Sequence, residues 1–271
     1  MTRKDNPQQD TDPFYSQHGE DIIAWKIFQH SSGPKYFVEI GMVDGIRFSN
    51  TYALERRGWH GLCVEAHPHF VDMVRQHRPA STVVHAAAAD VSNTNIDFYM
   101  DPRGDLSSLI AHDESEMKGK FGHWFKGYEK VRVPARTLND MLKQANAPRF
   151  MEVVSIDIEG AELTALRGFD LNYWRPRLLI LEADDAAQRH KLNEYLQPQG
   201  YQLARMVGIN ALYTRKTIDA FRIRLVRVDQ KVLHTANPMD QSVTDQLFIP
   251  IAFETRSQHA MRVLRTMMLA A

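Results

Sequence analysis

The feature that most constrains this sequence is the alternation of short apolar runs with helix-like segments. Runs at 36–40, 61–66, 81–89, 152–159 and 178–184 have the length of buried strands, and segments with helical apolar spacing separate them. Strands that alternate with helices predict a parallel sheet with right-handed crossovers, the doubly wound α/β class. Ligands in that class bind beyond the carboxyl ends of the strands, so residues there are the candidates for function.

The end of this pattern predicts a closing hairpin. Two further runs, 201–207 and 210–216, are separated by Gly208-Ile209, which is typical of an antiparallel turn. The expected organisation is a flexible tail over 1–13, a domain over 14–215 and a C-terminal extension over 216–271. Within the extension we expect strands at 222–228 and 246–253 and a helix near 256–270.

Composition removes several classes of function. The chain has 271 residues with 33 Lys+Arg against 33 Asp+Glu, whereas a nucleic-acid or anionic-membrane binder needs a basic surplus. Cys63 is the single cysteine, so neither an intramolecular disulfide nor a cysteine-based zinc site can form. No apolar run approaches the ~20 residues that cross a bilayer. These observations favour a cytoplasmic protein with no nucleic-acid or membrane partner.

The loop after the first run carries glycines and two acidic residues. In 39–45 (EIGMVDG), Gly41 and Gly45 let the backbone turn sharply and approach a ligand. The spacing differs from GxGxxG, and Glu39 and Asp44 would repel the pyrophosphate of a dinucleotide. The same acids suit a cofactor that carries an ammonium and a sulfonium, S-adenosylmethionine. The alternative is a glycine turn with two solvated acids.

Glu65 ends the second run, 24 residues after Gly41. A carboxylate at this place can accept hydrogen bonds from both hydroxyls of an adenosine ribose. Many strands end in glutamate, so the alternative is a surface or helix-capping acid. We place Ala66 and Ala88 beside the adenine, where small side chains leave room, and the alternative for the alanines near 88 is close helix packing.

Three segments of the chain, in order, resemble the FkbM family of S-adenosylmethionine-dependent methyltransferases. They are YSQHGED (15–21), residues 37–68 and residues 154–169, and 107–109, 136–140 and 210–213 are also similar. The resemblance implies a class I methyltransferase fold, whose sheet ends in an antiparallel hairpin. It also implies methyl transfer, usually to a hydroxyl oxygen of a sugar or natural product. The extension lies outside it.

The resemblance implies cofactor roles for nine positions. Gln17, in the N-terminal motif, would reach the methionine end of the cofactor. Met42-Val43 departs from the family, which more often has small or polar residues there. The positions that match the family's motifs are Gln17, Glu39, Gly41, Asp44, Gly45, Ser49, Asn50, Thr51 and Glu65.

A second group of acids follows the fourth run. Asp157 and Glu159 are two residues apart, so they share one face of an extended strand at the ligand edge, with Asp157 also beside the cofactor. Either carboxylate can orient an acceptor hydroxyl or take its proton during an in-line methyl transfer. With Glu182 and Asp184 they could instead hold a divalent metal, which we do not favour. Alternatively, Glu159 and Glu162 merely stabilise the next helix N-terminus.

Residues 101–130 lose clear periodicity and gather glycine, histidine, charged and aromatic residues. A loop of this length inside a compact domain is typical of a lid or a binding segment. We expect His112 to act as a base, and Trp124, Phe125 and Tyr128 to supply flat surface for a sugar or ring. The alternatives are a solvated histidine and aromatic residues that anchor the loop on the core.

One basic concentration remains outside this scheme. Arginines alternate with apolar residues there, which predicts a strand whose arginine-bearing face is exposed to solvent. The alternative is that the basic residues recognise an acidic or phosphorylated ligand. The residues are Arg215, Lys216, Arg222, Arg224 and Arg227.

The sequence therefore predicts an S-adenosylmethionine-dependent O-methyltransferase of natural-product biosynthesis, acting on a small-molecule hydroxyl. The alternative is a catalytically inactive S-adenosylmethionine-binding module or a partner subunit. The apolar stripe at 261–268 is expected to form core or dimer contacts, so a homodimer through the extension is part of the prediction.

Overall fold

The centre of the fold is a seven-stranded sheet with the order β3-β2-β1-β7-β8-β10-β9. The computed structural model describes residues 12–228. The first five strands run parallel, and β10 and β9 form an antiparallel hairpin against β8. This topology confirms the predicted class I methyltransferase arrangement. The strands are β1 (Tyr36–Ile40), β2 (His60–Glu65), β3 (Thr82–His85), β7 (Val153–Ile156), β8 (Leu178–Glu182), β9 (Gln202–Val207) and β10 (Asn210–Thr214).

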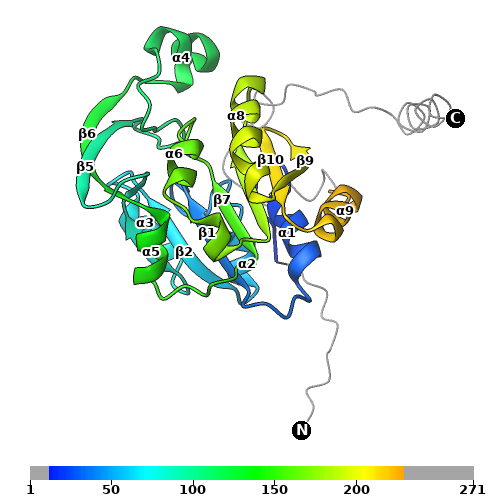
Figure 1. Ribbon diagram of the computed structural model, residues 1–271. Coiled ribbons are helices and arrows are strands. Elements are labelled where there is room, and N and C mark those ends of the chain that lie inside the picture. The colour runs from blue at the N-terminus through cyan, green and yellow to red at the C-terminus, as the bar shows by residue number, and fades with distance from the viewer. Residues whose placement is uncertain (1–11, 229–271) are drawn as a thin grey trace, which may run out of the picture. The chain divides into compact units, whose positions relative to one another are not determined.

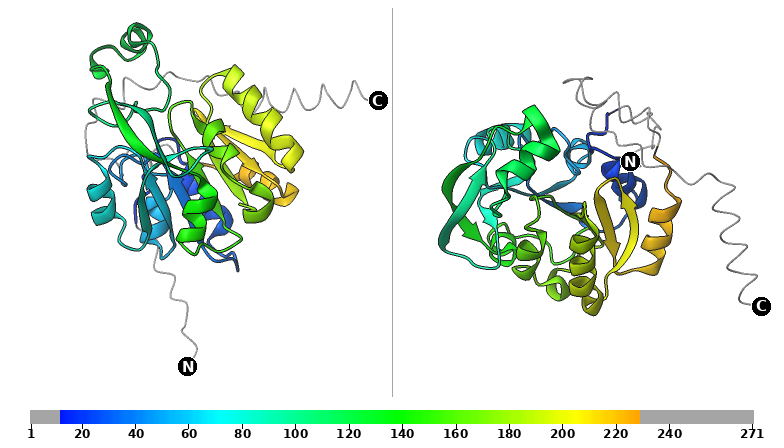
Figure 2. Two further views of the ribbon diagram at one scale, coloured as in Figure 1. Left: turned by 60° about the vertical axis from the view of Figure 1, so that its left-hand side comes forward. Right: turned by 90° about the horizontal axis from the view of Figure 1, so that it is seen from above.

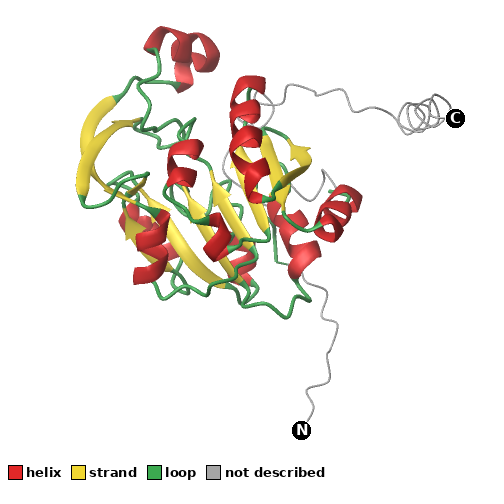
Figure 3. Cartoon of the chain, viewed as in Figure 1, coloured by secondary structure: helices red, strands yellow, loops and turns green. Residues whose placement is uncertain are grey.

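Helices cover both faces of this sheet (Figures 1 and 3). Successive side chains of a strand point to opposite faces, so in β1 Val38 and Ile40 pack on one side and Phe37 on the other. The first face is covered by α5 (Leu138–Gln144), α6 (Glu162–Arg167), α7 (Leu171–Trp174) and α8 (Ala186–Leu196). The second is covered by α1 (Glu20–Phe28), α2 (Tyr52–Arg56), α3 (Val71–His77) and α9 (Thr217–Leu225).

A second sheet of three strands, with the order β4-β6-β5, extends from the first. Both views of Figure 2 show the long β5 and β6 ribbon at the side of the main sheet. The predicted loop over 101–130 is more ordered than expected, because it contains two helices and the start of β6. The elements are β4 (Ala87–Ala88), β5 (Thr94–Met100), α4 (Glu114–Phe121), the 3-10 helix η1 (Gly122–Trp124) and β6 (Glu129–Arg136), and a second 3-10 helix, η2 (Gln197–Gln199), precedes β9.

Two strand predictions need correction. The run at 81–89 is divided, since β3 joins the main sheet while β4 pairs with β6. The expected strand at 222–228 is wrong, because residues 222–225 form the last part of α9 (Thr217–Leu225) and no strand follows in the described chain. Ile223 is buried there against β9 and α1, so the alternation of arginine with apolar residues belongs to a helix with one buried side. The strand at 246–253, the helix near 256–270 and the proposed dimer contacts lie outside the described residues.

Within residues 12–228, no helix is long and apolar enough to cross a bilayer.

Candidate active site

The carboxyl ends of β1, β2, β7 and β8 meet at one edge of the sheet, and the glycine loop lies there. Gly41 has φ +74°, and a Cβ on it would lie 1.8 Å from the carbonyl oxygen of Asp157. The Gly41 amide donates to the Val64 carbonyl, and the Asp157 amide donates to the Ile40 carbonyl. Glycine is therefore required at 41, and it brings the predicted cofactor loop directly against the predicted acceptor acids.

Glu65 is buried at the end of β2 and holds the glycine loop. Its Oε2 accepts hydrogen bonds from the amides of Met42 (3.0 Å) and Val43 (2.9 Å), and its Oε1 accepts one from His67. Burial raises the pKa of this carboxyl, while the three amide donors act in the opposite direction. Oε2 thus has both acceptor positions filled, whereas Oε1 can accept one more bond, so Glu65 can still receive a ribose hydroxyl.

Glu39 has other contacts than those expected of a cofactor acid. Its carboxylate accepts bonds from the Ser49 and Thr51 hydroxyls and the Asn50 amide, and it pairs with Arg78 at 2.9 Å. Because Glu39 follows Phe37 by two positions, it points toward the face covered by α2 and α3. Glu39, Ser49 and Thr51 therefore bind one another on the side of the sheet that α2 and α3 cover, where they position the loop. A direct contact with the cofactor stays a prediction for these three residues.

Arg78 lies at the centre of this arrangement, which we call the arginine network. Its side chain is fully buried and donates from Nη1 to Glu39, from Nε to Glu55 and from Nη2 to Thr51. Arg78 was not among the predicted site residues, because an arginine directly after a short helix is typical of a solvent-exposed helix end. Nothing in its local pattern distinguishes it from exposed Arg75 on the same helix.

The remaining predicted cofactor residues of this loop contact either the turn itself or the neighbouring strand β7. Asp44 caps the turn, since its Oδ1 accepts from the amides of Ile46 and Arg47, both at 2.8 Å. Gly45 has φ +84° and donates to the Met42 carbonyl. The Asn50 side chain reaches across to the Ser155 hydroxyl of β7 at 3.0 Å.

A compact group of acids lies at the ends of β7 and β8. One carboxylate oxygen from each of Asp157, Glu159 and Glu182 lies within 4.8 Å of the others, and we call these three residues the acid cluster. Asp157 and Glu159 are half-buried, and Glu182 is 7% exposed. The Oε2 atom of Glu182 is buried without a hydrogen-bond partner among the described residues. Oxygen ligands of this kind also suit a hard divalent cation.

The proximity of these carboxyl groups changes their acidity. Burial, followed by the negative charge of Glu162, raises the pKa of Asp157 to about 7. Burial and the charge of Asp157 raise the pKa of Glu159 and of Glu182 well above the usual range. The acid cluster therefore retains protons near neutral pH, and Asp157 is suited to exchange one with a ligand there.

The backbone at Glu159 is unusual for a residue with a side chain. Its φ is +54°, in the left-handed region, and Gly160 follows with φ +95°. The Glu159 carbonyl accepts a bond from the Ser108 hydroxyl at 2.9 Å, and His112 Nε2 lies 3.0 Å from the same oxygen. The structure thus brings His112 to the acid cluster, where its contact is with the backbone of Glu159.

The segment before α1 reaches the same edge. Glu20 Oε1 accepts a bond from the side chain of Asn210, which is paired with Glu182 in the register of β8 and β10. Gln17 and His18 immediately precede this helix, and Ser16 bridges to Phe48 beside the cofactor loop. SQHGED (16–21) and NALY (210–213) were both identified as motifs from the sequence. The hydrogen bond between the side chains of Asn210 and Glu20, which joins the two motifs, was not predicted.

The segment with α4, the lid predicted over 101–130, contacts the end of β8, and its action as a lid stays a prediction. Lys120 Nζ lies 2.7 Å from Asp184 Oδ2 at the end of β8. Phe125 is buried with Met117 and Leu106, so it anchors the segment, as the alternative interpretation held. Tyr128 has a buried hydroxyl without a partner in the described part of the chain, and burial followed by the charge of Glu159 raises its pKa.

The predicted adenine residues lie at the far side of Glu65. Ala66 is half-buried, and its carbonyl oxygen lies 3.1 Å from His85 Nε2. Ala88 is buried in β4, where it pairs with Arg136. Ala66 follows β2 of the main sheet and Ala88 belongs to β4 of the second sheet, so the expected adenine position lies between the two sheets.

The residues present fit the bound form of S-adenosylmethionine. Three buried polar atoms near the edge lack hydrogen-bond partners in the described chain: His18 Nε2, Glu182 Oε2 and Asn210 Oδ1. All three can accept hydrogen bonds, with the histidine in the appropriate tautomer, and two are oxygens beside acidic residues. An ammonium and a sulfonium are the charges such an edge favours.

Comparisons with known proteins identify one protein family and several solved structures of low sequence identity. No curated protein matches the chain significantly. Among solved structures, the METTL16 MTase domain is 12% identical with a TM-score of 0.42, covering 72% of this chain and 66% of that one, slightly less than two thirds of its length. A putative O-methyltransferase from Klebsiella pneumoniae is 13% identical with a TM-score of 0.38, covering 74% of this chain and 81% of that one.

A protein-family model also matches the chain. The model of the methyltransferase FkbM domain matches residues 39–203, which is more than half of the chain. The match includes the glycine loop, Glu65, the lid and the acid cluster, and the segment with Gln17 precedes it. The chain therefore belongs to the FkbM family of S-adenosylmethionine-dependent methyltransferases.

Proposed function

We propose that the chain methylates a hydroxyl group of a small molecule such as a sugar or natural product. The observation that carries this proposal is the acid cluster, in which Asp157 and Glu159 lie beside the cofactor loop with raised pKa values. A hydroxyl acceptor must lose a proton as it is methylated, and a carboxylate with a pKa near the working pH is the group that can take it.

Asp157 would accept this proton. Its backbone carbonyl contacts Gly41, so its carboxylate stands next to the loop that would hold the cofactor. When bound, S-adenosylmethionine supplies a methyl group on a positively charged sulfur. Glu159 and His112 would then orient the acceptor oxygen, and the left-handed backbone held by Ser108 fixes the direction of the Glu159 side chain.

The acceptor side favours a neutral small molecule over a nucleic acid. Three carboxyl groups at the reaction edge would repel phosphates. Tyr128 offers a buried hydroxyl next to the acids, and half-exposed Trp124 offers a ring whose partner is the Arg103 guanidinium at 4.2 Å. A sugar or polyol can use both a flat apolar surface and hydrogen-bonding groups.

For the cofactor we propose direct contacts from Gln17, Gly41, Gly45 and Glu65. Asp157 would border the methionine end, and Ala66 and Ala88 the adenine. The supporting observations are the close backbone packing at Gly41 and the remaining acceptor position on Glu65 Oε1. Asp44 and Asn50 would hold the shape of the loop through the bonds described above.

The first experiment measures the binding of S-adenosylmethionine and S-adenosylhomocysteine by titration calorimetry. Glu65→Ala should weaken both by about tenfold or more, since it removes charge-assisted bonds to ribose hydroxyls and to the loop. Exposed Glu129→Ala is the matched control and should bind like the wild type. Unchanged binding in Glu65→Ala would contradict the proposed cofactor site.

The second experiment offers a panel of sugar, polyol and phenol acceptors with the methyl donor and detects a mass gain of one methylene by mass spectrometry. A methylated oxygen supports the proposal, and methylation at nitrogen, carbon or an oligonucleotide would overturn it. Cofactor binding without turnover on any acceptor would indicate an inactive module or partner subunit. An arm with EDTA tests whether the acid cluster works with a divalent cation.

A further inference from the structure

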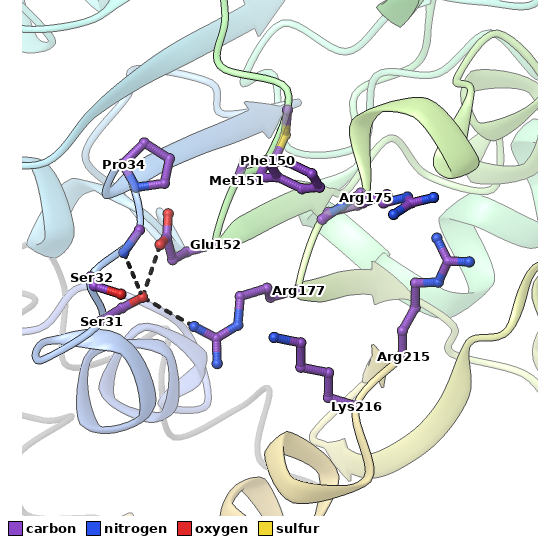
Figure 4. A pocket seen from close by; sticks show the side chains of 12 residues that line it. Ser31, Ser32, Pro34, Phe150, Met151, Glu152, Arg175, Arg177, Arg215 and Lys216 are labelled. Atoms are coloured by element: carbon purple, nitrogen blue, oxygen red, sulfur yellow. Dashed lines mark hydrogen bonds between the residues drawn. The ribbon is translucent and has the colours of Figure 1, made fainter.

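A cavity lies at the edge of the sheet opposite the candidate active site, where β1, β7 and β8 begin. It has a volume of about 570 Å³, within the range of small-molecule sites. Four cationic side chains line it, from the segment before β8 and from the segment between β10 and α9 (Figure 4). They are Arg175, Arg177, Arg215 and Lys216.

Two of these guanidinium groups point toward one another. In Figure 4, the guanidinium groups of Arg175 and Arg215 lie near one another at one side of the cavity. Both are anchored on Asn172, because Arg175 Nε donates to its carbonyl at 2.8 Å and Arg215 Nη2 donates to its side-chain oxygen at 3.2 Å. Like charges held close together repel, so this arrangement favours the binding of an anion beside them.

Lys216 and Arg177 form the second cationic position. The Lys216 side chain lines the same cavity (Figure 4), and its amine has no partner among residues 12–228. Arg177 is fixed by buried Asp219 at 2.8 Å and by Ser31 at 3.0 Å. Its orientation is therefore set before any ligand arrives, which lowers the entropic cost of binding.

The carboxylates of this region are already engaged. Glu152, at the base of the cavity, is buried and accepts bonds from the Ser31 hydroxyl and the Tyr36 amide. Asp219 is paired with Arg177. Among the described lining residues, Arg175, Arg215 and Lys216 thus retain positive charge that no carboxylate balances.

We propose that this cavity binds the diphosphate group of a small anionic ligand. Guanidinium forks match phosphate oxygens in pairs, and the two cationic positions suit two linked phosphates. Phe150 lines the same cavity and is 51% exposed, so it offers a flat surface for a base or another apolar part of the ligand. The site is independent of the methyl-transfer edge.

The test measures binding of inorganic pyrophosphate and of adenosine diphosphate to the full chain by titration calorimetry at low salt. Both should bind, and Arg175→Gln and Lys216→Gln should each weaken binding about tenfold, because each removes a charged donor. Exposed Arg222→Gln on α9 is the matched control and should change the affinity less than twofold. Melting temperature and S-adenosylhomocysteine binding should stay at wild-type values in all three variants.

The two ligands also identify the source of the diphosphate. Tighter binding of adenosine diphosphate that is lost in Phe150→Ala indicates a nucleotide, whereas equal affinities indicate a diphosphate on another carrier. The proposal is overturned if neither ligand binds, or if Arg222→Gln weakens binding as much as Arg175→Gln does. Binding of an acidic peptide in place of pyrophosphate, with the same arginine dependence, would overturn it in favour of a protein partner.

Discussion

Carboxyl groups are buried in two regions of the described chain, and a cation pairs with them in one region but not in the other. In the arginine network, Glu39 and Glu55 share a single buried guanidinium, with bonds of 2.9 Å to each. In the acid cluster, no ion pair within residues 12–228 joins Asp157, Glu159 or Glu182 to a cation, and burial raises their pKa values. The comparison separates charges that hold the fold from charges that are left available to a ligand.

Four substitutions test this distinction, and the largest effect is expected in catalysis. Asp157→Asn keeps the shape of the side chain but cannot accept a proton. We expect kcat to fall by about 10²–10⁴-fold, the usual contribution of a general base. The measurement is methyl transfer at saturating donor with the acceptor found in the panel, and half-exposed Asp184→Asn at the same edge is the control.

The pH dependence sharpens this prediction. Because Asp157 accepts a proton only as the carboxylate, the wild-type rate should rise as pH increases through about 7 and then level off. The variant should show a flat profile over the same range. A wild-type rate that falls over that range would contradict the assignment of Asp157 as the base.

The next largest effect concerns the arginine network. Arg78→Met leaves Glu39 and Glu55 buried without a cation, so the free energy of unfolding should fall by about 3–5 kcal/mol. Urea unfolding measures this change, with exposed Arg75→Met on the same helix as the control. A loss below that of Arg75→Met would show that the carboxylates have another counter-charge. Adding Glu39→Gln and Glu55→Gln should recover part of the stability.

The acid cluster should respond in the opposite direction. Glu182→Gln removes one of three repelling groups, so we expect about 1 kcal/mol of added stability at pH 8. Since the folded state raises these pKa values, it binds more protons than the unfolded state between about pH 4 and 7, and stability falls as pH rises through this window.

Melting curves from pH 4 to 8 measure this slope, which should be shallower in Glu182→Gln than in the wild type. Exposed Glu129→Gln is the control and should keep the wild-type slope. If the stability of the wild type instead rises between about pH 4 and 7, a counter-charge must neutralise the acid cluster in solution.

The smallest effect is expected at the lid. Lys120 and Asp184 are 60% and 44% exposed, so Lys120→Met should change the free energy of unfolding by less than about 1 kcal/mol. Urea unfolding at low and high salt measures it, and the small difference should vanish at high salt. A loss comparable to that in Arg78→Met would place this pair with the structural charges.

The sequence predicted the sheet and its ligand edge because both follow from local patterns. Apolar runs of strand length and the turn at Gly208-Ile209 determine the order of elements. The strand predicted at 222–228 was wrong because a short alternation of arginine and apolar residues also fits one buried side of a helix. Burial of Ile223 against β9 and α1, a tertiary effect, decided between them.

The sequence predicted which strand ends form the site, but not the direction in which each side chain points. Glu39 and Asp157 both end parallel runs, yet Glu39 points into the face of α2 and α3 while Asp157 lies beyond β7. Arg78, which determines the role of Glu39, is 39 residues away in the sequence. Contacts of this kind depend on how helices pack across a sheet, which no local spacing records.

The arginine network also has a consequence for the order in which the chain can fold. All the side chains that accept hydrogen bonds from Arg78 lie between residues 39 and 55, on β1, α2 and the turns beside them, and the rings of Phe37 and Tyr52 also contact it. Because their sequence separation is short, loop closure costs little and these contacts can form before the second half of the chain arrives. The acid cluster needs β7 and β8, so its mutual repulsion enters only after a neutralised half has already formed.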